Sequence, residues 1–287
     1  MAGVEGRVIA VTGAGGGLGR EYALLLASSG AKVVINDLGG LRDGTGAGTA
    51  MADQVADEIT KAGGQAVAHY ESIATEDGAA SLVQTALNAF GSIDGVVNNA
   101  GILRDQAFHK MTPDGWESVL QVHLFGSFYV TRAAWPHFRE QGHGRIVVAT
   151  STSGLFGNFG QANYSAAKNG LVGLINTLAI EGAKYHIMAN AVAPIASTRM
   201  TADVAPQDIL DTIPPGHVAP IVGHLLSDEC TDTGMTFVVG GGQAHRVALF
   251  QNEGITFDHS LSIAEVTARW SQVTDMSKAS LARPPFT

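Results

Sequence analysis

Residues 8–19 (VIAVTGAGGGLG) join a short apolar run to a cluster of glycines. The apolar run is typical of a buried parallel strand. A helical pattern begins near Gly17 and ends at Gly30, and the residues AKVVIN at 31–36 predict a second strand. This order of strand, glycine-rich turn, helix and strand is the context that a dinucleotide-binding turn requires. We therefore expect this part of the chain to bind a dinucleotide cofactor.

The glycine cluster indicates how a pyrophosphate would be held. Glycines let the backbone approach the phosphates closely, and free N–H groups at the start of the helix attract their negative charge. A glycine run by itself also occurs in plain turns, so the surrounding strands and helix decide the interpretation. The residues expected to contact the cofactor here are Gly13, Gly16, Gly17, Leu18 and Gly19.

Asp37 ends the second predicted strand and stands roughly 20 residues beyond the glycines, where a carboxylate binds the adenosine ribose hydroxyls. A carboxylate at this place repels a 2′-phosphate, and the nearest cation, Arg42, lies in a glycine-rich loop. We therefore expect NAD rather than NADP as the cofactor. The alternative is that Asp37 only caps a turn.

Ser151, Tyr164 and Lys168 stand at S-x12-Y-x3-K spacing. Tyr164 and Lys168 are one helical turn apart, so both side chains lie on one face of the predicted helix. A phenol with a pKa near ~10 is a poor base at neutral pH, and a neighbouring ammonium lowers that pKa. Ser151 follows the predicted strand at 145–150 and can hold the substrate oxygen while Tyr164 exchanges the proton. The trio predicts hydride exchange between nicotinamide and an alcohol, with Ser153 as the alternative serine.

Strands and helices alternate along the chain, which predicts an α/β fold with a doubly wound parallel sheet of seven strands. The expected strands lie near 7–12, 32–36, 65–69, 93–97, 145–150, 187–192 and 235–238. The expected helices lie near 17–29, 49–62, 76–89, 113–140, 162–184, 217–226 and 263–274.

The sequence predicts two parts, a dinucleotide-binding catalytic domain at 1–240 and a C-terminal extension at 241–287. The extension holds one apolar helical face, made of Ile263, Val266, Trp270 and Val273. Such a face predicts that the extension packs on the same subunit or on a neighbouring one.

The composition limits which classes of partner and which cell compartment we expect. The net charge of −9, from 17 basic and 26 acidic residues, argues against nucleic acid and anionic membranes as partners. The sequence contains no membrane-spanning apolar run, the first strand leaves no room for a signal peptide, and the ending PPFT is not a peroxisomal address. Cys230 is the only cysteine, so no intrachain disulfide is possible, and no metal-binding histidine spacing occurs. We expect a cytoplasmic enzyme without a metal or a membrane anchor.

These residues together resemble the short-chain dehydrogenase/reductase family. The resemblance rests on the glycines, the trio, the segment NNAG at 98–101 and Pro194 after the sixth strand, and it covers residues 6 to about 240. It implies a Rossmann-type fold in which Tyr164 and Lys168 also contact the cofactor. It implies that the helices at 113–140 and 162–184 pair subunits in a homodimer or homotetramer. The further cofactor contacts that it implies are Asn99, Ala100 and Gly101 on the adenosine side, and Pro194 and Ile195 near the nicotinamide.

A narrower resemblance is to the (3R)-hydroxyacyl-CoA dehydrogenases of multifunctional β-oxidation enzymes. It is carried by NDLGG at 36–40, NNAGILRD at 98–105, GNFGQANYSAAK at 157–168 and the tail at 264–280. It implies NAD-dependent oxidation of a 3-hydroxyacyl thioester from a fatty acid or a steroid side chain, with Ser72 and Ile73 beside the adenine. The alternatives are a 17β-hydroxysteroid dehydrogenase, a 3-oxoacyl-acyl-carrier-protein reductase and a non-catalytic nucleotide sensor.

Two positions depart from the common family pattern. His123 stands where many members have asparagine, and Ile195 stands where glycine is usual after Pro194. His123 is expected to replace that asparagine in holding a helix kink and a water relay to Lys168, so it is counted among the catalytic candidates. The alternative is a hydrogen-bonded histidine inside a packed helix.

Overall fold

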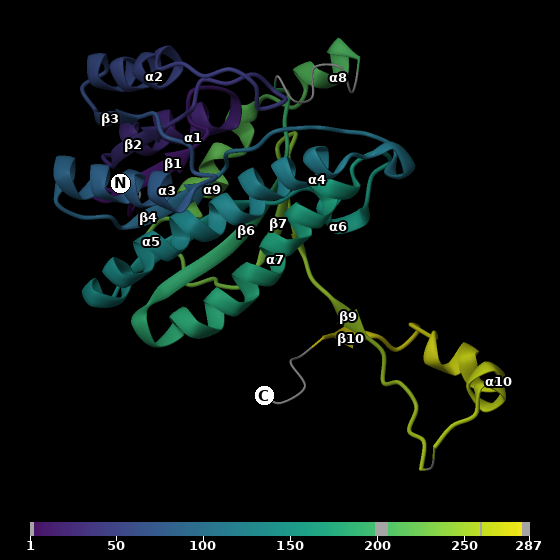
Figure 1. Cartoon of the computed structure of the whole chain (residues 1–287). Coiled ribbons are helices and arrows are strands. Elements are labelled where there is room, and N and C mark those ends of the chain that lie inside the picture. The colour runs from purple at the N-terminus through teal and green to yellow at the C-terminus, as the bar shows by residue number, and fades with distance from the viewer. Residues whose placement is uncertain (1–2, 199–205, 259, 283–287) are drawn as a thin grey trace. The chain divides into compact units, whose positions relative to one another are not determined.

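The structure is a computed structural model that describes residues 3–198, 206–258 and 260–282. Its centre is one sheet with the strand order β3-β2-β1-β4-β5-β6-β7-β8 (Figure 1). Strands β1 to β7 pair in parallel, which confirms the predicted doubly wound sheet. Their bounds are β1 Val8–Thr12, β2 Lys32–Asn36, β3 Gln65–His69, β4 Gly95–Asn98, β5 Gly144–Ala149, β6 Ile187–Ile195 and β7 Thr236–Gly240.

An eighth strand, β8 (Gln243–Val247), lies beside β7 and is not predicted from the sequence. Gly241 and Gly242 connect the two strands with φ values of 56° and 75°. Glycine adopts this left-handed conformation without strain, so two residues suffice for the turn. The sheet therefore continues past residue 240, and the chain divides into the units 1–246 and 247–287.

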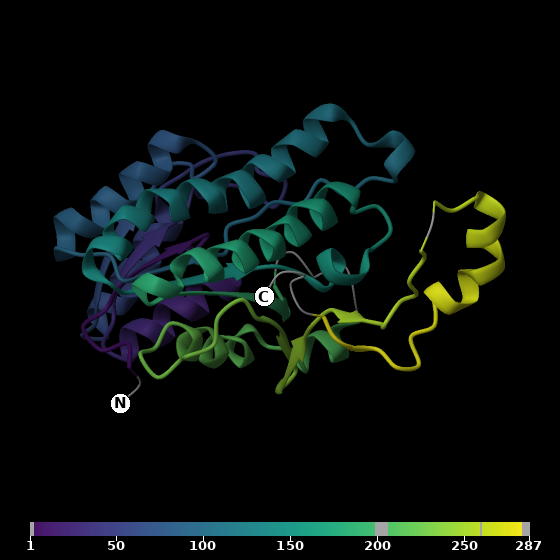
Figure 2. The ribbon, with the colours of Figure 1, turned by 90° about the horizontal axis from the view of Figure 1, so that it is seen from below.

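Helices cover both faces of the sheet (Figures 1 and 2). One face carries α1 (Gly17–Ser28), α2 (Ala50–Lys61) and α9 (Ala219–Leu225), and the other carries α3 (Glu76–Phe90), α5 (Gly126–Gln141) and α7 (Ala162–Gly182). Strand β1 is buried on both faces: Ile9 and Val11 join the cluster with α1, whereas Val8 and Ala10 join the cluster with α3. Burial on both faces explains why this strand reads as a continuous apolar run. Two short helices, α6 (Thr152–Phe156) and α8 (Gln207–Asp211), complete this unit.

The helix predicted over 113–140 is interrupted. α4 (Pro113–Leu120) begins after Thr112, whose side chain accepts a hydrogen bond from the N–H of Gly115. A π-helical turn, Gln121–Phe125, separates α4 from α5 and carries His123. Such turns occur mostly as single insertions in α-helices and often mark functional sites.

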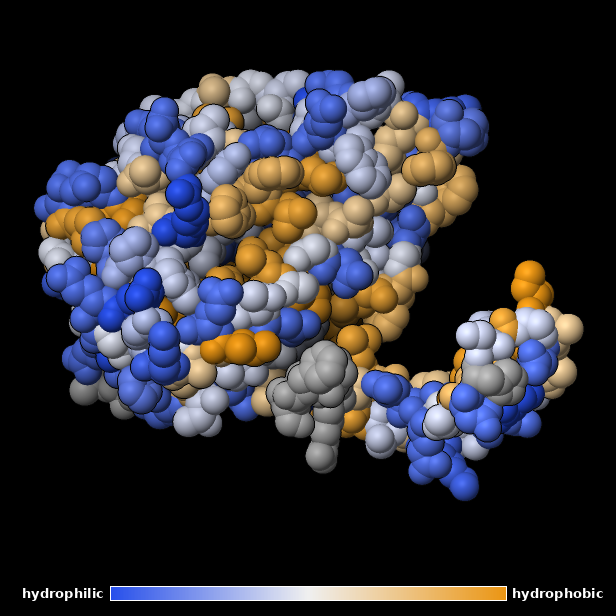
Figure 3. Space-filling model, turned by 60° about the horizontal axis from the view of Figure 1, so that its bottom comes forward, coloured by the Kyte–Doolittle hydropathy of each residue, from blue (hydrophilic) through white to orange (hydrophobic). Residues whose placement is uncertain are grey.

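The unit 247–287 contains little secondary structure. β9 (Phe250–Gln251) pairs antiparallel with β10 (Ser280–Leu281), and α10 (Ile263–Val273) begins with a capping box between Ser262 and Glu265. None of the described residues 248–282 is buried, and Ile263 is 88% exposed. Hydrophobic side chains are correspondingly visible on its surface (Figure 3). Where this extension packs stays a prediction.

Across the described parts of the chain, no helix combines the length and the apolar character that crossing a membrane requires.

Candidate active site

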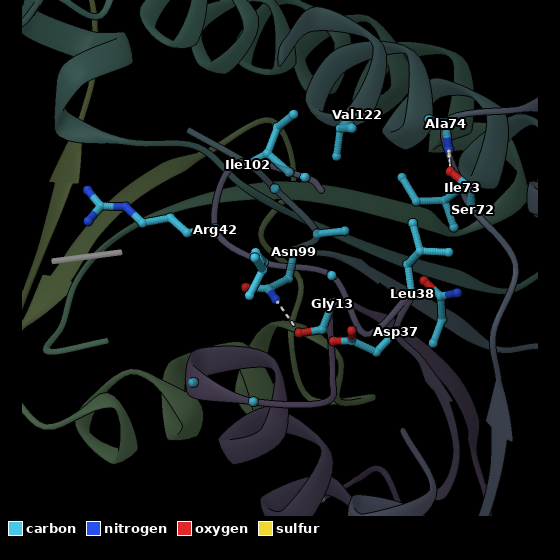
Figure 4. Close-up of a pocket in the computed structure, with 18 of the residues that line it drawn as sticks. Gly13, Asp37, Leu38, Arg42, Ser72, Ile73, Ala74, Asn99, Ile102 and Val122 are labelled. Carbon is cyan, nitrogen blue, oxygen red and sulfur yellow. Dashed lines mark hydrogen bonds between the residues drawn. The ribbon is translucent and has the colours of Figure 1, made fainter. Parts of the chain in front are cut away.

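A cavity of about 430 Å³ opens where β1, β2 and β4 end (Figure 4). The strand order reverses between β1 and β4, which is the place where open α/β sheets bind their ligands. Ten of the predicted cofactor residues line this cavity: Gly13, Gly16, Gly17, Leu18, Asp37, Ser72, Ile73, Asn99, Ala100 and Gly101. The structure places the other five, Gly19, Tyr164, Lys168, Pro194 and Ile195, outside its lining.

The glycine turn has the shape that a pyrophosphate needs. Gly13 has a φ of 64°, and a Cβ there would lie 2.8 Å from the Cα of Ala100, so only glycine fits. Gly17 starts α1 with a φ of 52°, and a Cβ there would meet nothing closer than Thr198 at 3.6 Å. The backbone is therefore bare beside the N-terminus of α1, where a phosphate would be attracted. These residues fit a dinucleotide.

Gly19 has a different place from the one expected. A Cβ on Gly19 would lie 2.2 Å from the carbonyl oxygen of Gly13 and 2.8 Å from Nδ2 of Asn99. Gly19 thus allows α1 to pack tightly behind the turn rather than lining the cavity. Close packing of helix on strand is one of the functions of glycine in dinucleotide-binding turns.

Thr12 connects the glycine turn to the turn after β4. This role of Thr12 was not predicted from the sequence. Its hydroxyl accepts hydrogen bonds from the backbone N–H groups of Asn99 and Ala100, both at 3.0 Å. The side-chain amide of Asn99 donates to the carbonyl oxygen of Thr12 at 3.1 Å. It also donates to the carbonyl oxygen of Gly13 at 3.2 Å (Figure 4). The feature of the sequence that could have indicated this role is a hydroxyl residue directly before the first glycine of the turn.

Asp37 lies at the cavity wall beside Leu38 (Figure 4). Its Oδ2 accepts a hydrogen bond from the N–H of Gly15 at 2.8 Å, and its Oδ1 accepts one from the N–H of Gly39 at 2.7 Å. A carboxylate has about four acceptor positions, so two remain for ribose hydroxyls. Arg42, in the loop that follows Asp37, also lines the cavity.

The structure brings Ser151, Tyr164 and Lys168 together. Ser151 caps α6, where its hydroxyl accepts a hydrogen bond from the N–H of Ser153 at 3.1 Å. The Ser151 side chain also lies close enough to the Tyr164 phenol to lower its pKa. The Lys168 ammonium donates to the carbonyl oxygen of Ala149 at the end of β5, and it lies 5.5 Å from the centre of the Tyr164 ring. A phenol, a hydroxyl and an amine therefore share one site.

The pKa directions differ from the simplest expectation. Burial raises the pKa of Tyr164, and the hydrogen bond from Ser151 offsets only part of this rise. Burial lowers the pKa of Lys168 to about 7. The reason is that both groups are removed from water, while the Lys168 ammonium is directed at a backbone carbonyl. The burial of Tyr164 therefore decides the direction of its pKa shift, and the lowering expected from Lys168 does not.

His123 connects the cavity to this site. Its Nε2 lies 3.0 Å from the nitrogen and 2.9 Å from the oxygen of the Ile102 backbone. Burial and the nearby Lys168 charge hold the pKa of His123 well below its ordinary value. His123 lies in the π-helical turn, which agrees with the helix kink expected at this position. It is also a hydrogen-bonded histidine inside a packed helix, which is the alternative interpretation. Its catalytic role stays a prediction.

Pro194 and Ile195 form the end of β6, paired with Val239 and Gly240 of β7. This end of β6 is adjacent in the sheet to the end of β5, from which Ser151 follows. Their predicted position near the nicotinamide stays a prediction. Among the described residues, no group of histidine, cysteine and carboxylate side chains could hold a metal ion.

Residues 7–208 match the short chain dehydrogenase family. The chain belongs to this family. It is therefore an oxidoreductase that acts on a secondary alcohol and uses a nicotinamide cofactor. The resemblance predicted from the motifs is thereby confirmed.

Two relatives are similar to nearly the whole of this chain. A short-chain type dehydrogenase/reductase of Mycobacterium tuberculosis is 64% identical over 98% of this chain and 99% of its own length. Peroxisomal multifunctional enzyme type 2 of Drosophila melanogaster is 48% identical over 96% of this chain, which spans only 46% of that protein. The chain thus covers about half of this multifunctional relative.

Solved structures agree with the fold. The full-length Drosophila melanogaster enzyme superimposes with a TM-score of 0.83 at 40% identity, covering 98% of this chain and 47% of that one. A short chain dehydrogenase of Mycobacterium avium also gives 0.83 at 41% identity, covering 99% of this chain and 98% of that one.

Proposed function

We propose that the protein oxidises a (3R)-hydroxyacyl-CoA to the 3-oxoacyl-CoA with NAD. The observation that carries the proposal is the site shared by Ser151, Tyr164 and Lys168, in a chain that is 48% identical to multifunctional enzyme type 2 over 96% of its length. A hydroxyacyl-CoA dehydrogenase of Mycobacterium tuberculosis adds support, with 37% identity over 89% of the chain. The acyl group comes from a fatty acid or a steroid side chain.

The chain's own residues supply binding and proton transfer. Ser151 holds the substrate hydroxyl, and Tyr164 as phenolate accepts its proton. Lys168 orients the ribose of the cofactor, and its side-chain nitrogen lies 5.5 Å from the centre of the Tyr164 ring. When bound, the nicotinamide supplies the acceptor for the hydride that leaves the carbinol carbon. His123 holds the turn after β4 against the Tyr164 ring, and Pro194 and Ile195 border the nicotinamide.

NAD is favoured over NADP by the carboxylate of Asp37. Its two oxygens are already held by the N–H groups of Gly15 and Gly39, so the carboxylate keeps a fixed position at the cavity wall. A fixed negative charge there attracts ribose hydroxyls as an acceptor and repels a 2′-phosphate. Ser72 and Ile73, in the same cavity lining, border the adenine.

A second candidate is 3-oxoacyl-acyl-carrier-protein reduction. The observation that favours it is a 3-oxoacyl-[acyl-carrier-protein] reductase of Synechocystis, 39% identical over 84% of this chain. The identity and the share of this chain that is covered are both lower than for multifunctional enzyme type 2. The net charge of −9 also disfavours docking of an acidic carrier protein.

We also propose that two copies associate through α5 and α7. The groove between these helices is lined by apolar and aromatic side chains that include Phe128, Tyr129, Trp135 and Leu174. Phe128 is 42% exposed, and a contiguous apolar surface of this kind favours association. The assembly is a homodimer or a homotetramer. The cytoplasm is the proposed compartment, consistent with a single, buried cysteine.

The test follows nicotinamide reduction by absorbance with purified protein. The panel holds (3R)- and (3S)-hydroxyacyl-CoAs of several lengths, 17β-hydroxysteroids and, in the reverse direction, 3-oxoacyl carrier protein with NADH or NADPH. We expect the highest kcat/KM with a (3R)-hydroxyacyl-CoA and NAD, and Tyr164→Phe should lower kcat by about 10²–10⁴ with little change in NAD affinity. Faster turnover of the carrier-protein or steroid substrates would replace the proposed substrate. Full turnover by Tyr164→Phe would show that Tyr164 is not the acid/base of the reaction.

A further inference from the structure

Asn163 directly precedes Tyr164 in the first turn of α7, and its side chain is fully buried. Its Nδ2 donates to the carbonyl oxygen of Arg104 at 3.1 Å and to that of Gly115 at 3.0 Å. Its Oδ1 accepts a hydrogen bond from the backbone N–H of Tyr164 at 2.8 Å. Both amide protons and the amide oxygen are thus used, which is what a buried amide requires.

The partners of Asn163 belong to three different segments. Arg104 lies in the loop that leaves the cavity after Gly101, and Gly115 lies in the first turn of α4. Tyr164 itself belongs to α7. The amide therefore ties the catalytic helix both to α4 and to the loop that continues from the cofactor cavity.

Two further hydrogen bonds hold the same loop against the start of α7. The N–H of Gln106 donates to the carbonyl oxygen of Gly160 at 2.8 Å. The side chain of Gln161 donates to Oδ2 of Asp105 at 2.7 Å. The second of these joins exposed side chains, whereas Asn163 is itself fully buried. Asn163 is consequently the part of this junction with the strongest positional effect.

The bond to Tyr164 completes the start of the helix. The first four N–H groups of an α-helix have no partner within the helix. Gln161, the residue that precedes α7, provides no side-chain bond to them. Asn163 accepts from the N–H of Tyr164 and so fixes the backbone from which the phenol extends.

We propose that Asn163 is a positioning residue for Tyr164, holding the start of α7 so that the phenol meets the Ser151 hydroxyl. The inference rests on the proposed role of Tyr164 in proton transfer. It does not depend on which alcohol is the substrate. A displacement of about 1 Å is enough to cost an enzyme roughly 10²-fold in rate, so a lost anchor at this point should be visible in turnover.

The test compares Asn163→Asp and Asn163→Ser with the control Ser165→Ala. Asp has the shape of Asn but places an oxygen, instead of the amide nitrogen, against two carbonyl oxygens. Ser keeps a small polar group, but its side chain is too short to contact those carbonyl oxygens. Ser165 follows Tyr164 on the same turn, and its buried hydroxyl has no partner among the described residues. Its removal should be nearly neutral, because no hydrogen bond is lost.

Two readouts distinguish positioning from a purely structural effect. The first is the ultraviolet titration of the Tyr164 phenol, obtained in each background by subtracting the spectrum of the corresponding Tyr164→Phe protein. The second is kcat with (3R)-hydroxydecanoyl-CoA and NAD, with the NAD dissociation constant and the unfolding temperature measured alongside. We expect both variants to lower kcat about 10²-fold, and we expect Asn163→Ser, which adds no charge beside the phenol, to move the phenol titration to higher pH. NAD affinity should change less than threefold, which is about 0.65 kcal/mol.

Each outcome decides the inference. Variants that unfold at lower temperature, yet titrate and turn over like the wild type where they are folded, would show a structural role only and overturn it. If Asn163→Asp fails to fold, Asn163→Ser carries the same comparison. If the wild type does not oxidise the acyl-CoA but the phenol titration still moves, the positioning role stands and the proposed substrate fails. If the wild type is active and the titration does not move, the positioning role fails.

Discussion

The imidazole of His123 meets the phenol ring of Tyr164 edge-on, with ring centres 5.1 Å apart and planes at 89°. On its other side, the imidazole binds the backbone of Ile102, next to the turn that lines the cofactor cavity. One buried side chain therefore spans the distance between the cavity and the proposed acid/base. Its Nδ1 has no partner among the described residues, which suits a neutral ring.

This arrangement predicts a steric dependence between Gly101 and His123. A Cβ on Gly101 would lie 2.2 Å from Cε1 of His123, and the ring cannot give way because Ile102 holds it. Gly101→Ala should lower the free energy of unfolding by about 1–3 kcal/mol, the range for overpacking. In the His123→Ala background the same change should cost less, because the clashing ring is gone. Denaturant unfolding of the two single variants and the double variant measures this coupling.

Gly173→Ala provides the matched control for that cycle. A Cβ at Gly173 would meet nothing within 4 Å, and this residue lies in the middle of α7. Alanine there should be neutral or stabilising by up to about 1 kcal/mol, because it has the higher helix propensity. Equal costs of Gly101→Ala with and without His123 would contradict the proposed contact.

The sequence predicted the parts of the site that local patterns encode. The glycine turn, Asp37 and the trio follow from fixed spacings within or directly after predicted elements, and the structure places them at neighbouring strand ends. Spacing along one helix was enough to put Tyr164 and Lys168 on one face.

Other features depend on contacts between segments far apart in the chain, which spacing does not show. Asn163 matters through carbonyl groups of Arg104 and Gly115, about 50 to 60 positions away. The position of Gly19 depends on the approach of Gly13, and the pKa of Tyr164 depends on how completely α7 is covered. Burial is a property of the packed molecule, so its effect on the Tyr164 pKa relative to that of the Lys168 charge could not be predicted from the sequence.

The rate of alcohol oxidation should rise with pH, because Tyr164 must lose its proton to act as a base. Burial raises the pKa of Tyr164 above that of an ordinary phenol, so the rise in kcat/KM should continue beyond the pH at which an exposed tyrosine ionises. Ser151→Ala should move the rise to still higher pH, because the hydrogen bond from Ser151 lowers this pKa. Ser153→Ala is the control, because Ser153 contributes a backbone N–H to Ser151. An activity that falls as pH rises through 7 would instead report the loss of the Lys168 proton, whose pKa is about 7.

Asp37→Ser should shift the cofactor preference from NAD toward NADP. Removing the carboxylate removes the repulsion of a 2′-phosphate and weakens the hold on the ribose hydroxyls. A change of at least about tenfold in the ratio of kcat/KM values is expected, which corresponds to 1.4 kcal/mol. Asp43→Ser, in the same loop but with its carboxylate bound to Thr45, is the control. An unchanged ratio in Asp37→Ser would rule out this carboxylate as the selector.

Phe128→Glu should dissociate the proposed assembly. Phe128 lies in the groove between α5 and α7, and an introduced charge there would lose its contact with water when a second copy covers the groove. Sedimentation velocity should show a dimer or tetramer for the wild type and a shift toward monomer for the variant. Ile209→Glu on α8, which is half exposed and outside this groove, should sediment like the wild type. A monomeric wild type at micromolar concentration would contradict the interface.

His143 should make the protein less stable in acid. Burial, followed by the charges of Arg145 and Arg7, lowers the pKa of His143 in the folded state to about 4, from an ordinary value of 6.5. Asp228 and Asp94 oppose this shift but do not cancel it. As pH falls from 6.5 to 4, the unfolded chain takes up this proton before the folded one does. Stability is therefore fully present above pH 6.5 and is lost through this window.

The measurement is the free energy of unfolding by denaturant between pH 4 and 7 for the wild type, His143→Gln and the exposed His217→Gln. The difference between the curves isolates the contribution of one histidine from all others. The wild type and His217→Gln should fall with the same slope, and His143→Gln should fall less steeply because it has no imidazole to protonate. A His143→Gln curve that runs parallel to that of the wild type would show that His143 takes up its proton equally in both states, which its burial beside two arginines argues against.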